Sequence, residues 1–326
     1  MARYVFLTGH RKAGTTLLMS LFDGHKSATS YPSDISLFYA YFPGFTGDPK
    51  LSDAQLRERL SLVLRKSLEG VKTAEGAQDF IDAQKIVDLF WNHFGTGDLR
   101  SRAHVLDALG RAWCEYAGHS FEDSVVVFKE TSQSIFFGEL LAAFPEVRMI
   151  HLMRDPRDNY AALKAGVSSY YAKLGENELA TLASLINRAR MDMIAARVNR
   201  ERHPDNFTVV RFEDLVADPK PEMQKLCDFL GWEFDEAMLA PTVMGRPQSG
   251  NSHEGKAFTA IDRSNTGAWS KRISPEEAKV IEYWCSNEMR DWGYAPAFPE
   301  AECQQAFADF YGWYNTRYFF SDSFAR

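Results

Sequence analysis

A glycine-containing turn between a short apolar run and a helix constrains this chain more than any other feature. The turn follows the apolar residues 4–7 and reads Gly9-His10-Arg11-Lys12-Ala13-Gly14-Thr15-Thr16. Its two glycines have the spacing of a Walker A phosphate loop, G-x-x-x-x-G-K-[ST]. A strand–turn–helix unit of this kind presents backbone N–H groups to a phosphate at the N-terminus of the helix. The turn therefore predicts an α/β fold with a phosphate site at its first strand.

The loop departs from the Walker pattern at its lysine. Thr16 stands where the metal-binding hydroxyl would be, but Thr15 occupies the lysine position and the lysine of the loop is Lys12. The cationic side chain therefore comes from a different point on the loop. We expect it to contact a different part of the ligand than the lysine of a nucleoside-triphosphate loop does.

Length and charge limit the classes of partner. The 326 residues suit one large α/β domain with an insertion, or two small domains. The formal net charge of −7 argues against nucleic-acid binding, so an anionic ligand needs a local basic cluster. Four cysteines without a C-x-x-C pair argue against a zinc site or a disulfide scaffold and predict a reducing, cytoplasmic compartment. No apolar run approaches the roughly 18 residues of a membrane span, and we expect no signal peptide before the first strand.

Short apolar runs alternate with helical patterns along the chain. The expected strands are 3–8, 124–128, 147–152 and 207–212. The expected helices are 15–22, 51–70, 77–94, 100–117, 135–144, 158–165, 179–202, 220–230 and 275–289, and the stretches 31–46 and 245–268 are expected to be loops. This alternation predicts a P-loop-like three-layer α/β fold with a central parallel sheet of about four to five strands. We expect a single domain over residues 1–326, with a helical insertion at about 48–118 and a C-terminal extension at about 292–326.

Four segments are expected to meet at one edge of this sheet, because ligands bind beyond the carboxyl ends of the strands in open α/β sheets. The phosphate loop is the first. The others are Lys129-Glu130-Thr131 after the second strand, Arg154-Asp155-Pro156-Arg157-Asp158 after the third, and Ser264-Asn265-Thr266-Gly267-Ala268-Trp269-Ser270-Lys271 in the late loop. Three of the four bring cations to one rim of an acidic chain, which predicts a small polyanionic ligand.

Taken together and in this order, the motifs resemble those of sulfotransferases that use 3′-phosphoadenylyl sulfate (PAPS), closest to the bacterial and Golgi-type branch. The matching stretches are Lys12–Leu18, the lysine motif at 129–131, the R-D-P-R-D motif at 154–158, Arg211–Leu215, Asp218 to Gly231, and Gly267–Lys271. The resemblance leaves the helical segment 50–117 and the tail after 290 uncovered. It implies transfer of a sulfuryl group from PAPS to an acceptor hydroxyl, with adenosine 3′,5′-bisphosphate (PAP) as the product.

The resemblance also implies roles for individual residues. Lys12 is expected to contact the oxygen that bridges phosphate and sulfate, and Lys129 to face the sulfuryl group. The 5′-phosphate is expected to lie against the rest of the loop: Arg11, Ala13, Gly14, Thr15 and Thr16. The 3′-phosphate is expected to meet the guanidinium fork of Arg154 and the late loop, through Ser264, Gly267, Trp269 and Lys271. Trp269 would pack near the adenine or close the loop.

The charge of the transferred group bears on the need for a metal. A sulfuryl group has one negative charge fewer than a phosphoryl group, so lysine, hydroxyl and backbone donors can stabilise the bridging oxygen. Kinases instead use Mg²⁺ to bridge the phosphates. The third strand runs into Met153-Arg154 and not into a metal-binding aspartate. We therefore expect no metal.

Three positions depart from the pattern of the family. Ala162 lies eight residues after Arg154, where a serine usually helps to bind the 3′-phosphate; Ser168 or the late loop are candidates to replace it. Phe212 stands where a tyrosine is common. The late loop has residues 264–266 in place of the R-K-G tripeptide of the cytosolic branch.

The catalytic base stays open between three residues. The acceptor hydroxyl must lose a proton as it attacks sulfur. The cytosolic branch uses a histidine as the base at the position of Thr131, so a histidine base at this position is excluded here. The Golgi-type branch has a carboxylate about twenty residues beyond the first loop, where Asp34 lies. Glu130 and His10 are the reserves, and an ordinary turn role for Asp34 is an equal alternative.

Other residues near the motifs are expected to be structural. Arg157 and Asp158 are expected to pair at the start of a helix, and Glu213 to anchor the turn after the fourth strand. The aromatic residues of the stretch 38–45 are expected to pack as core or as a lid.

Two other functions and several partners stay open. An ATP-dependent small-molecule kinase is disfavoured by the missing G-K-[ST] step. A non-catalytic nucleotide-binding module is motivated by Ala162 and by the open choice of base. The acceptor is a sugar, lipid, small molecule or tyrosine hydroxyl, expected to bind at the 30–120 region. The aromatic residues from Phe307 to Phe320 are expected to form a helix or to lie at a homodimer interface.

Overall fold

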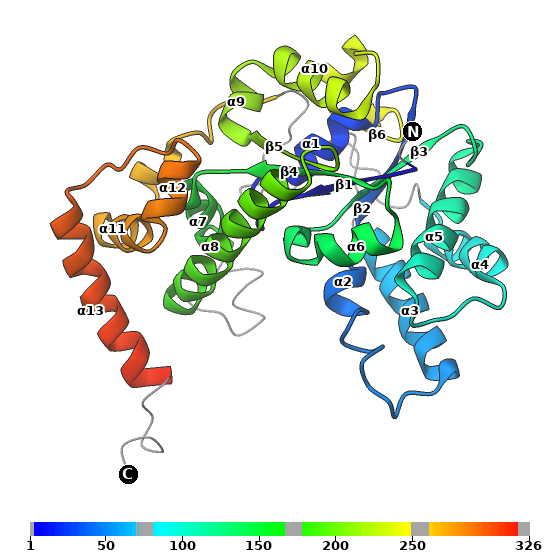
Figure 1. Ribbon diagram of the computed structural model, residues 1–326, viewed down its shortest axis with the longest axis horizontal. Helices are drawn as coiled ribbons and strands as arrows, with labels where there is room; N and C mark the ends of the chain where they lie inside the picture. Colours follow the sequence, from blue (N-terminus) through cyan, green and yellow to red (C-terminus); the bar gives the residue numbers. More distant parts are fainter. Residues whose placement is uncertain (1–2, 70, 72–80, 167–177, 249–260, 319–326) are drawn as a thin grey trace.

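A five-stranded parallel sheet forms the centre of the molecule (Figure 1). The computed structural model describes residues 3–69, 71, 81–166, 178–248 and 261–318. The strands are β1 (Tyr4–Thr8), β2 (Ala28–Asp34), β3 (Val125–Lys129), β4 (Arg148–Met153) and β5 (Phe207–Arg211). Their order in the sheet is β2-β3-β1-β4-β5. All neighbouring pairs are parallel. The predicted fold class is therefore confirmed.

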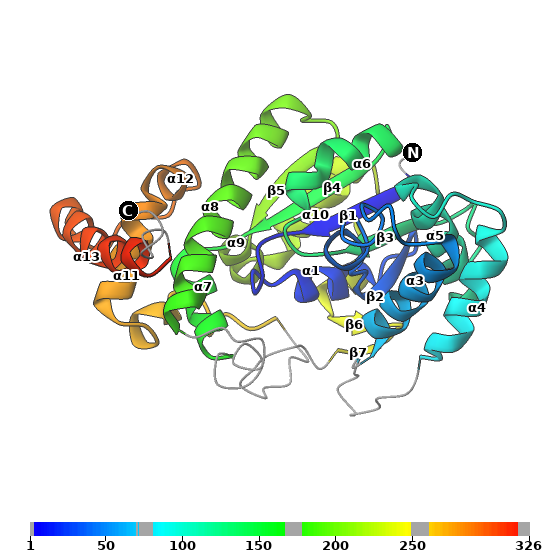
Figure 2. The same ribbon diagram turned by 90° about the horizontal axis from the view of Figure 1, so that it is seen from below.

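Helices cover both faces of the sheet because successive side chains of a strand point to opposite sides. In β1, Tyr4 and Phe6 belong to one core, whereas Val5 and Leu7 belong to the other. The first core packs under α2 (Leu37–Ala40), α3 (Asp53–Leu68), α4 (Ala83–Phe94), α5 (Arg102–Ala117), α6 (Phe137–Ala143) and α8 (Glu178–Arg202). The second packs under α1 (Thr15–Phe22), α9 (Phe212–Ala217) and α10 (Pro219–Leu230). Figure 1 shows these two layers on opposite sides of the sheet, and Figure 2, seen from below, shows the strands between α8 on the left and α4 on the right.

The edge strand β2 falls where we expected the start of a loop, so that expectation was wrong. Its sequence, ATSYPSD, has no apolar run and contains Pro32. An edge strand tolerates a proline because one of its sides has no neighbouring strand, so a residue that faces that side needs no backbone N–H for pairing. The register of β2 against β3 shifts between Ser30 and Asp34, and the shift places Asp34 directly opposite Lys129. Along the chain, the helices α3, α4 and α5 therefore come between β2 and β3, which are neighbours in the sheet.

The other predicted helices are present, with different ends in places. α4 begins at Ala83, where Asp82 accepts the N–H of Lys85 as an N-cap. The predicted helix 275–289 is two helices, α11 (Pro275–Trp284) and α12 (Ser286–Asp291). The remaining elements are η1 (Gln133–Phe136), α7 (Pro156–Lys164), η3 (Glu236–Leu239), β6 (Thr242–Val243), β7 (Arg246–Pro247), η4 (Ala268–Lys271) and α13 (Glu300–Tyr318). In the ranges that the structure describes, no helix is long and apolar enough to cross a membrane.

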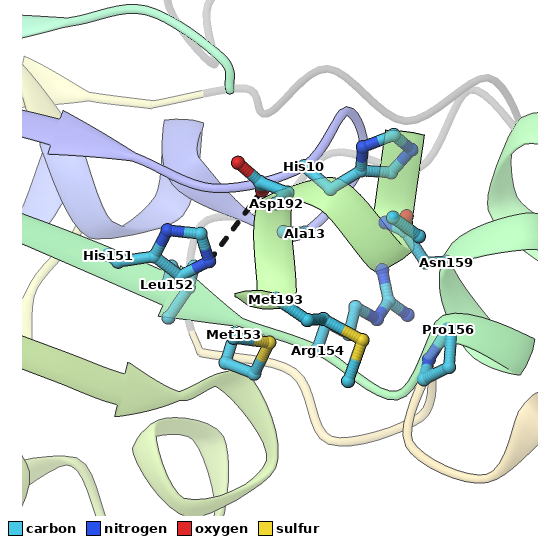
Figure 3. A pocket seen from close by; sticks show the side chains of 11 residues that line it. His10, Ala13, His151, Leu152, Met153, Arg154, Pro156, Asn159, Asp192 and Met193 are labelled. Atoms are coloured by element: carbon cyan, nitrogen blue, oxygen red, sulfur yellow. Dashed lines mark ion pairs between the residues drawn. The ribbon is translucent and has the colours of Figure 1, made fainter. Parts of the chain in front are cut away.

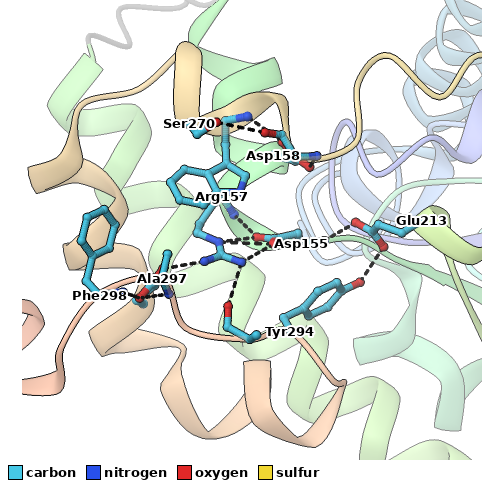
Figure 4. A network of polar contacts seen from close by, with 12 residues as sticks. Asp155, Arg157, Asp158, Glu213, Ser270, Tyr294, Ala297 and Phe298 are labelled. Carbon is cyan, nitrogen blue, oxygen red and sulfur yellow. Dashed lines mark hydrogen bonds and ion pairs between the residues drawn. The ribbon is translucent and has the colours of Figure 1, made fainter.

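The C-terminal helices attach to α7 and α8 through a third apolar cluster and a buried ionic network (Figure 4). Arg157 donates to Asp155 at 2.6 Å and to Glu282 of α11 at 2.5 Å, and also to the carbonyl of Ala295. The expected Arg157–Asp158 pair is therefore wrong, because the guanidinium turns toward α11. Glu213 accepts the backbone N–H of Asp155, which anchors the turn after β5 as expected.

We predict that Arg157→Met destabilises the protein by about 3–5 kcal/mol, because it leaves two buried carboxylates without their cation. Urea unfolding followed by circular dichroism measures this loss. Arg197→Met is the matched control, since Arg197 is 40% exposed in its side chain and pairs with Glu201 and Asp291 at the surface. Its cost is expected to stay within about 1 kcal/mol. Equal losses in the two variants would contradict the assigned role of the network.

Candidate functional site

The phosphate loop turns from β1 into α1 through three residues with left-handed backbone. Their φ angles are 154° at Gly9, 65° at Lys12 and 104° at Gly14. A Cβ on Gly9 would lie 2.4 Å from the carbonyl oxygen of Leu152, and one on Gly14 would lie 2.6 Å from the ring of Phe212. Both glycines are therefore required. Lys12 carries a side chain in the same backbone region, which costs about 1–3 kcal/mol and persists only where surrounding contacts impose it.

Two polar side chains impose this shape from beneath the loop. Arg154, just after β4, donates through Nη1 to the carbonyl oxygen of Lys12 at 2.6 Å. Asn159, on α7, donates through Nδ2 to the carbonyl oxygen of Arg11 at 2.6 Å. The guanidinium of Arg154 also lies 4.5 Å from the centre of the Phe212 ring. The loop is thus clamped at two consecutive carbonyls.

The N-terminus of α1 faces the concave side of this loop. The helix begins at Thr15, and its N-cap, Gly14, has no side chain to accept a first-turn N–H. The first N–H groups of a helix have no partner within the helix, so they attract an anion, which the helix dipole also favours. This geometry suits the phosphate that the sequence predicts.

A second cation lies beside the loop, at the end of β3. Lys129 Nζ is 2.6 Å from Asp34 Oδ2 and 3.4 Å from Thr16 Oγ1. The sheet order brings these residues together because β2, β3 and β1 are neighbours and their carboxyl ends lie at one edge. The side chain of Lys129 is 3% exposed, whereas that of Asp34 is 39% exposed. The side chain of Asp34 is therefore partly exposed, although its Oδ1 atom is buried and has no hydrogen-bond partner among the described residues.

Lys12 belongs to the same charged cluster. Burial lowers the pKa of its ammonium group to about 8; the nearby Lys129 and Arg154 also lower it, and Asp34 opposes the shift. Lys12 and Lys129 therefore share Asp34 as a nearby carboxylate, whereas the carboxylates near Arg154 are Asp155, Asp158 and Glu213. Beside the loop the two lysines outnumber Asp34, and such a local surplus of positive charge attracts a small polyanion.

Arg154 also joins the phosphate loop to the late loop. Its Nη2 donates to the carbonyl oxygen of Asn265 at 2.9 Å. Asp158, at the start of α7, accepts the N–H groups of Gly267 and Trp269 at 2.7 Å and 2.8 Å (Figure 4). The structure therefore brings the late loop to the rim that the motifs predict.

The late-loop residues face different surroundings. Trp269 lies over the guanidinium of Arg157 at 4.5 Å and packs in the C-terminal cluster, a position that suits closing the loop. Ser264 donates its hydroxyl to Asp262 at 2.6 Å, and Lys271 is exposed at the end of η4. Ala162 is half-buried on α7. Ser168, a candidate to replace it, lies outside the described residues.

The three candidate bases have different environments. Glu130 is 2% exposed, and its carboxylate accepts the N–H groups of Leu37 and Phe38 at the start of α2. His10 is 7% exposed, and burial lowers the pKa of its ring to about 3. Asp34 contacts Lys129, and its side chain is partly exposed, with a buried Oδ1 atom that has no hydrogen-bond partner among the described residues. Its geometry suits proton transfer better than that of Glu130 or His10.

Sequence reasoning missed residues that shape the loop. Asn159 directly follows the R-D-P-R-D motif, and Phe212 was noted only for its lost hydroxyl. The signal for Asn159 was a polar residue on a helix whose surrounding side chains are buried. Elsewhere, the described parts of the chain contain no group of three or more His, Cys, Asp or Glu side chains that could hold a metal.

Comparison with known proteins gives a family match over most of the chain. A model described as the sulfotransferase family matches residues 4–236. Carbohydrate sulfotransferase 2 from Mus musculus and from Homo sapiens are each 30% identical over 96 residues, which is 27% of this chain. The match spans only 17% of the length of these curated relatives.

Solved structures show the same fold. The sulfotransferase domain from the Synechococcus PCC 7002 olefin synthase has a TM-score of 0.58 at 19% identity, over 91% of this chain and 95% of that one. The sulfotransferase domain from the curacin biosynthetic pathway has a TM-score of 0.57 at 18% identity, over 90% of this chain and 99% of that one. At these identities the likeness concerns the arrangement of the elements.

Proposed function

Because the chain belongs to the sulfotransferase family, we propose that it moves a sulfuryl group from PAPS to an acceptor hydroxyl and releases PAP. The family that the motifs resembled is confirmed by the match over residues 4–236. The observation that carries the proposed activity is the meeting of Lys12, Lys129 and Arg154 at the open N-terminus of α1. The family match and Thr15 in the Walker lysine position both speak against a kinase.

In this proposal the 5′-phosphate lies against the backbone of Ala13 and Gly14 and the hydroxyls of Thr15 and Thr16. Lys12 contacts the bridging oxygen, and Arg11 borders the same phosphate. Both Nη groups of Arg154 already hold carbonyl oxygens. We therefore propose that the 3′-phosphate displaces the carbonyl of Asn265 from Arg154, and that the late loop then adds Ser264, Gly267 and Lys271.

The transfer itself follows from the positions of Lys129 and Asp34. The acceptor oxygen forms a bond to sulfur as the bond between sulfur and the phosphate oxygen breaks. Charge grows on the departing phosphate oxygen, where Lys12 and Lys129 stabilise it without a metal. Asp34 takes the proton of the acceptor hydroxyl, since its carboxylate is 2.6 Å from Lys129 and 39% exposed in its side chain. A non-catalytic module is the second candidate, favoured by Ala162 in place of the usual serine.

The proposal extends to organisation and partners. We propose one sulfotransferase domain, in which residues 48–118 are the helical insertion and 292–326 the C-terminal extension. The acceptor would be a sugar, lipid, small-molecule or tyrosine hydroxyl, with sugars suggested by the names of the curated relatives. All four cysteines are free and buried, which supports a reducing, cytoplasmic compartment. A homodimer would use α13, where the ring of Tyr311 is 43% exposed.

We predict that the protein transfers labelled sulfuryl groups from PAPS to at least one acceptor class in the presence of EDTA. A panel of sugars, hydroxylipids, phenols and tyrosine peptides, analysed by chromatography of the labelled products, measures this. Lys129→Met serves as the control, because it removes the cation that faces the sulfuryl group. Tight PAP binding without turnover on any acceptor would favour the non-catalytic module.

Replacement of Asp34 by Asn separates catalysis from nucleotide binding. We predict that Asp34→Asn lowers kcat by about 10²–10⁴, the usual contribution of a general base, while the dissociation constant for PAP stays within about threefold of wild type. Asp228→Asn, at an exposed position of α10, should leave both quantities unchanged. Unchanged turnover in Asp34→Asn would return Asp34 to a structural role.

The pKa of Lys12 predicts a pH dependence for nucleotide binding. Below about pH 8 the ammonium group is charged and binds an anion; above it, the free protein loses this charge. The affinity for PAP should therefore fall as pH rises from about 7 to 9, as measured by calorimetry. Lys12→Arg should abolish this decline because arginine stays charged. If the affinity of the wild-type protein for PAP does not change across this pH range, the assigned contact between Lys12 and the nucleotide is refuted.

A further inference from the structure

A small cavity with polar side chains in a largely apolar wall lies directly beneath the phosphate loop, between β4, α7 and α8 (Figure 3). His10 and Ala13 of the loop line one side, His151 of β4 another, and Asn159 and Asp192 contribute from the two helices; Arg154 and five apolar residues of β4, α7 and α8 form the rest of the wall. The cavity leaves ≈ 10 Å³ of room for the centre of a water molecule. Figure 3 shows Asp192 between the two histidines.

Several polar atoms in the wall of this cavity are buried and have no hydrogen-bond partner among the described residues. His10 is 7% exposed, and Asn159 and Asp192 are each 2% exposed. Both ring nitrogens of His10, both carboxylate oxygens of Asp192 and Oδ1 of Asn159 have no partner among the described residues. Oδ2 of Asp192 lies 3.7 Å from Nε2 of His151, which is too long for a hydrogen bond. Each such group costs about 1–3 kcal/mol if it stays unsatisfied.

Burial also favours the neutral forms of these groups. It raises the pKa of Asp192 to about 7, against the opposing charge of Arg188 on the same helix. It lowers the pKa of His10 and of His151 to about 3, where Arg11 adds to the effect at His10. A neutral carboxyl and a neutral imidazole each offer one donor and one acceptor. A water molecule matches such a mixed set better than an ion does.

We propose that this cavity is the binding site of one buried water, which joins Asp192 to His10 and Asn159 and so holds the phosphate loop in its binding shape. The room available is close to the roughly 10–15 Å³ that one water needs, and buried waters make about three hydrogen bonds each. Asp192 and His10 are then positioning residues, since they act on the nucleotide through the loop.

The loop is attached to the cavity wall at four consecutive residues. The side chains of His10 and Ala13 line the cavity, Asn159 holds the carbonyl of residue 11, and Arg154 holds that of Lys12. The left-handed backbone of Lys12 depends on these attachments. Loss of the water loosens the loop, which weakens nucleotide binding more than it slows transfer in the bound state. This consequence rests on the proposed function, whereas the water site does not.

The first test is a crystal structure of the full chain at a resolution that shows ordered water. We expect a water within hydrogen-bond distance of Asp192 and of His10 or Asn159. A dry cavity, or direct hydrogen bonds that close it, would overturn the proposal. This result is independent of whether the protein binds PAP.

The second test compares two replacements of Asp192. Asp192→Asn keeps a donor and an acceptor in the cavity, so the dissociation constant for PAP should stay within about threefold; Asp192→Leu expels the water, and affinity should fall at least about tenfold. In turnover assays, Asp192→Leu should raise KM for PAPS while kcat stays within about threefold. Leu185→Ala, in the apolar cluster on the same helix, controls for general destabilisation and should lower Tm without changing affinity.

Equal weakening by Asn and Leu, or wild-type affinity in Asp192→Leu, would contradict the water-mediated role. Where Asp192→Leu does not fold, Asp192→Asn and the crystal structure decide. A wild-type chain that shows the water but does not bind PAP would refute the proposed function and leave the water site intact.

Discussion

The left-handed turn at Lys12 is the constraint on which the rest of the site depends. A non-glycine residue adopts this backbone only when its neighbours impose it. Here Asn159 holds the carbonyl of residue 11 and Arg154 holds the carbonyl of Lys12. The same turn aims the N-terminus of α1 at the ligand side and brings the Lys12 side chain toward Lys129. One local conformation therefore fixes both the phosphate cradle and the cation above it.

The charges of Lys12 and Lys129 beside this turn are partly offset by the carboxylate of Asp34. Asp34 reaches Lys129 because an edge strand with a register shift places the two residues opposite each other. Arg154 has a different role, since its fork joins the phosphate loop to the late loop. Under the proposed function, the acceptor side of the reaction is built on β2, and the nucleotide side on the ends of β1 and β4.

The sequence predicted the parts of the molecule that depend on local chemistry. Apolar runs and glycine spacing revealed four strands and the loop, and R-D-P-R-D located the cation at the end of β4. β2 escaped prediction because Pro32 and its polar residues are stabilised by pairing with β3, not by their own pattern. Glu282, one of the two carboxylate partners of Arg157, lies more than a hundred residues away on α11, and the cavity at Asp192 depends on the packing of α8 against the loop. Such long-range contacts leave no local signal.

Calorimetric titration of the wild-type chain with PAP, in EDTA, tests the central claim most directly. Adenosine 5′-monophosphate in the same buffer, and ATP with excess magnesium in a buffer without EDTA, are the comparison ligands, because they lack the 3′-phosphate. The account predicts micromolar binding of PAP and at least about tenfold weaker binding of both comparison ligands, a difference of about 1.4 kcal/mol or more. No binding of PAP, or tighter binding of magnesium ATP, would contradict it.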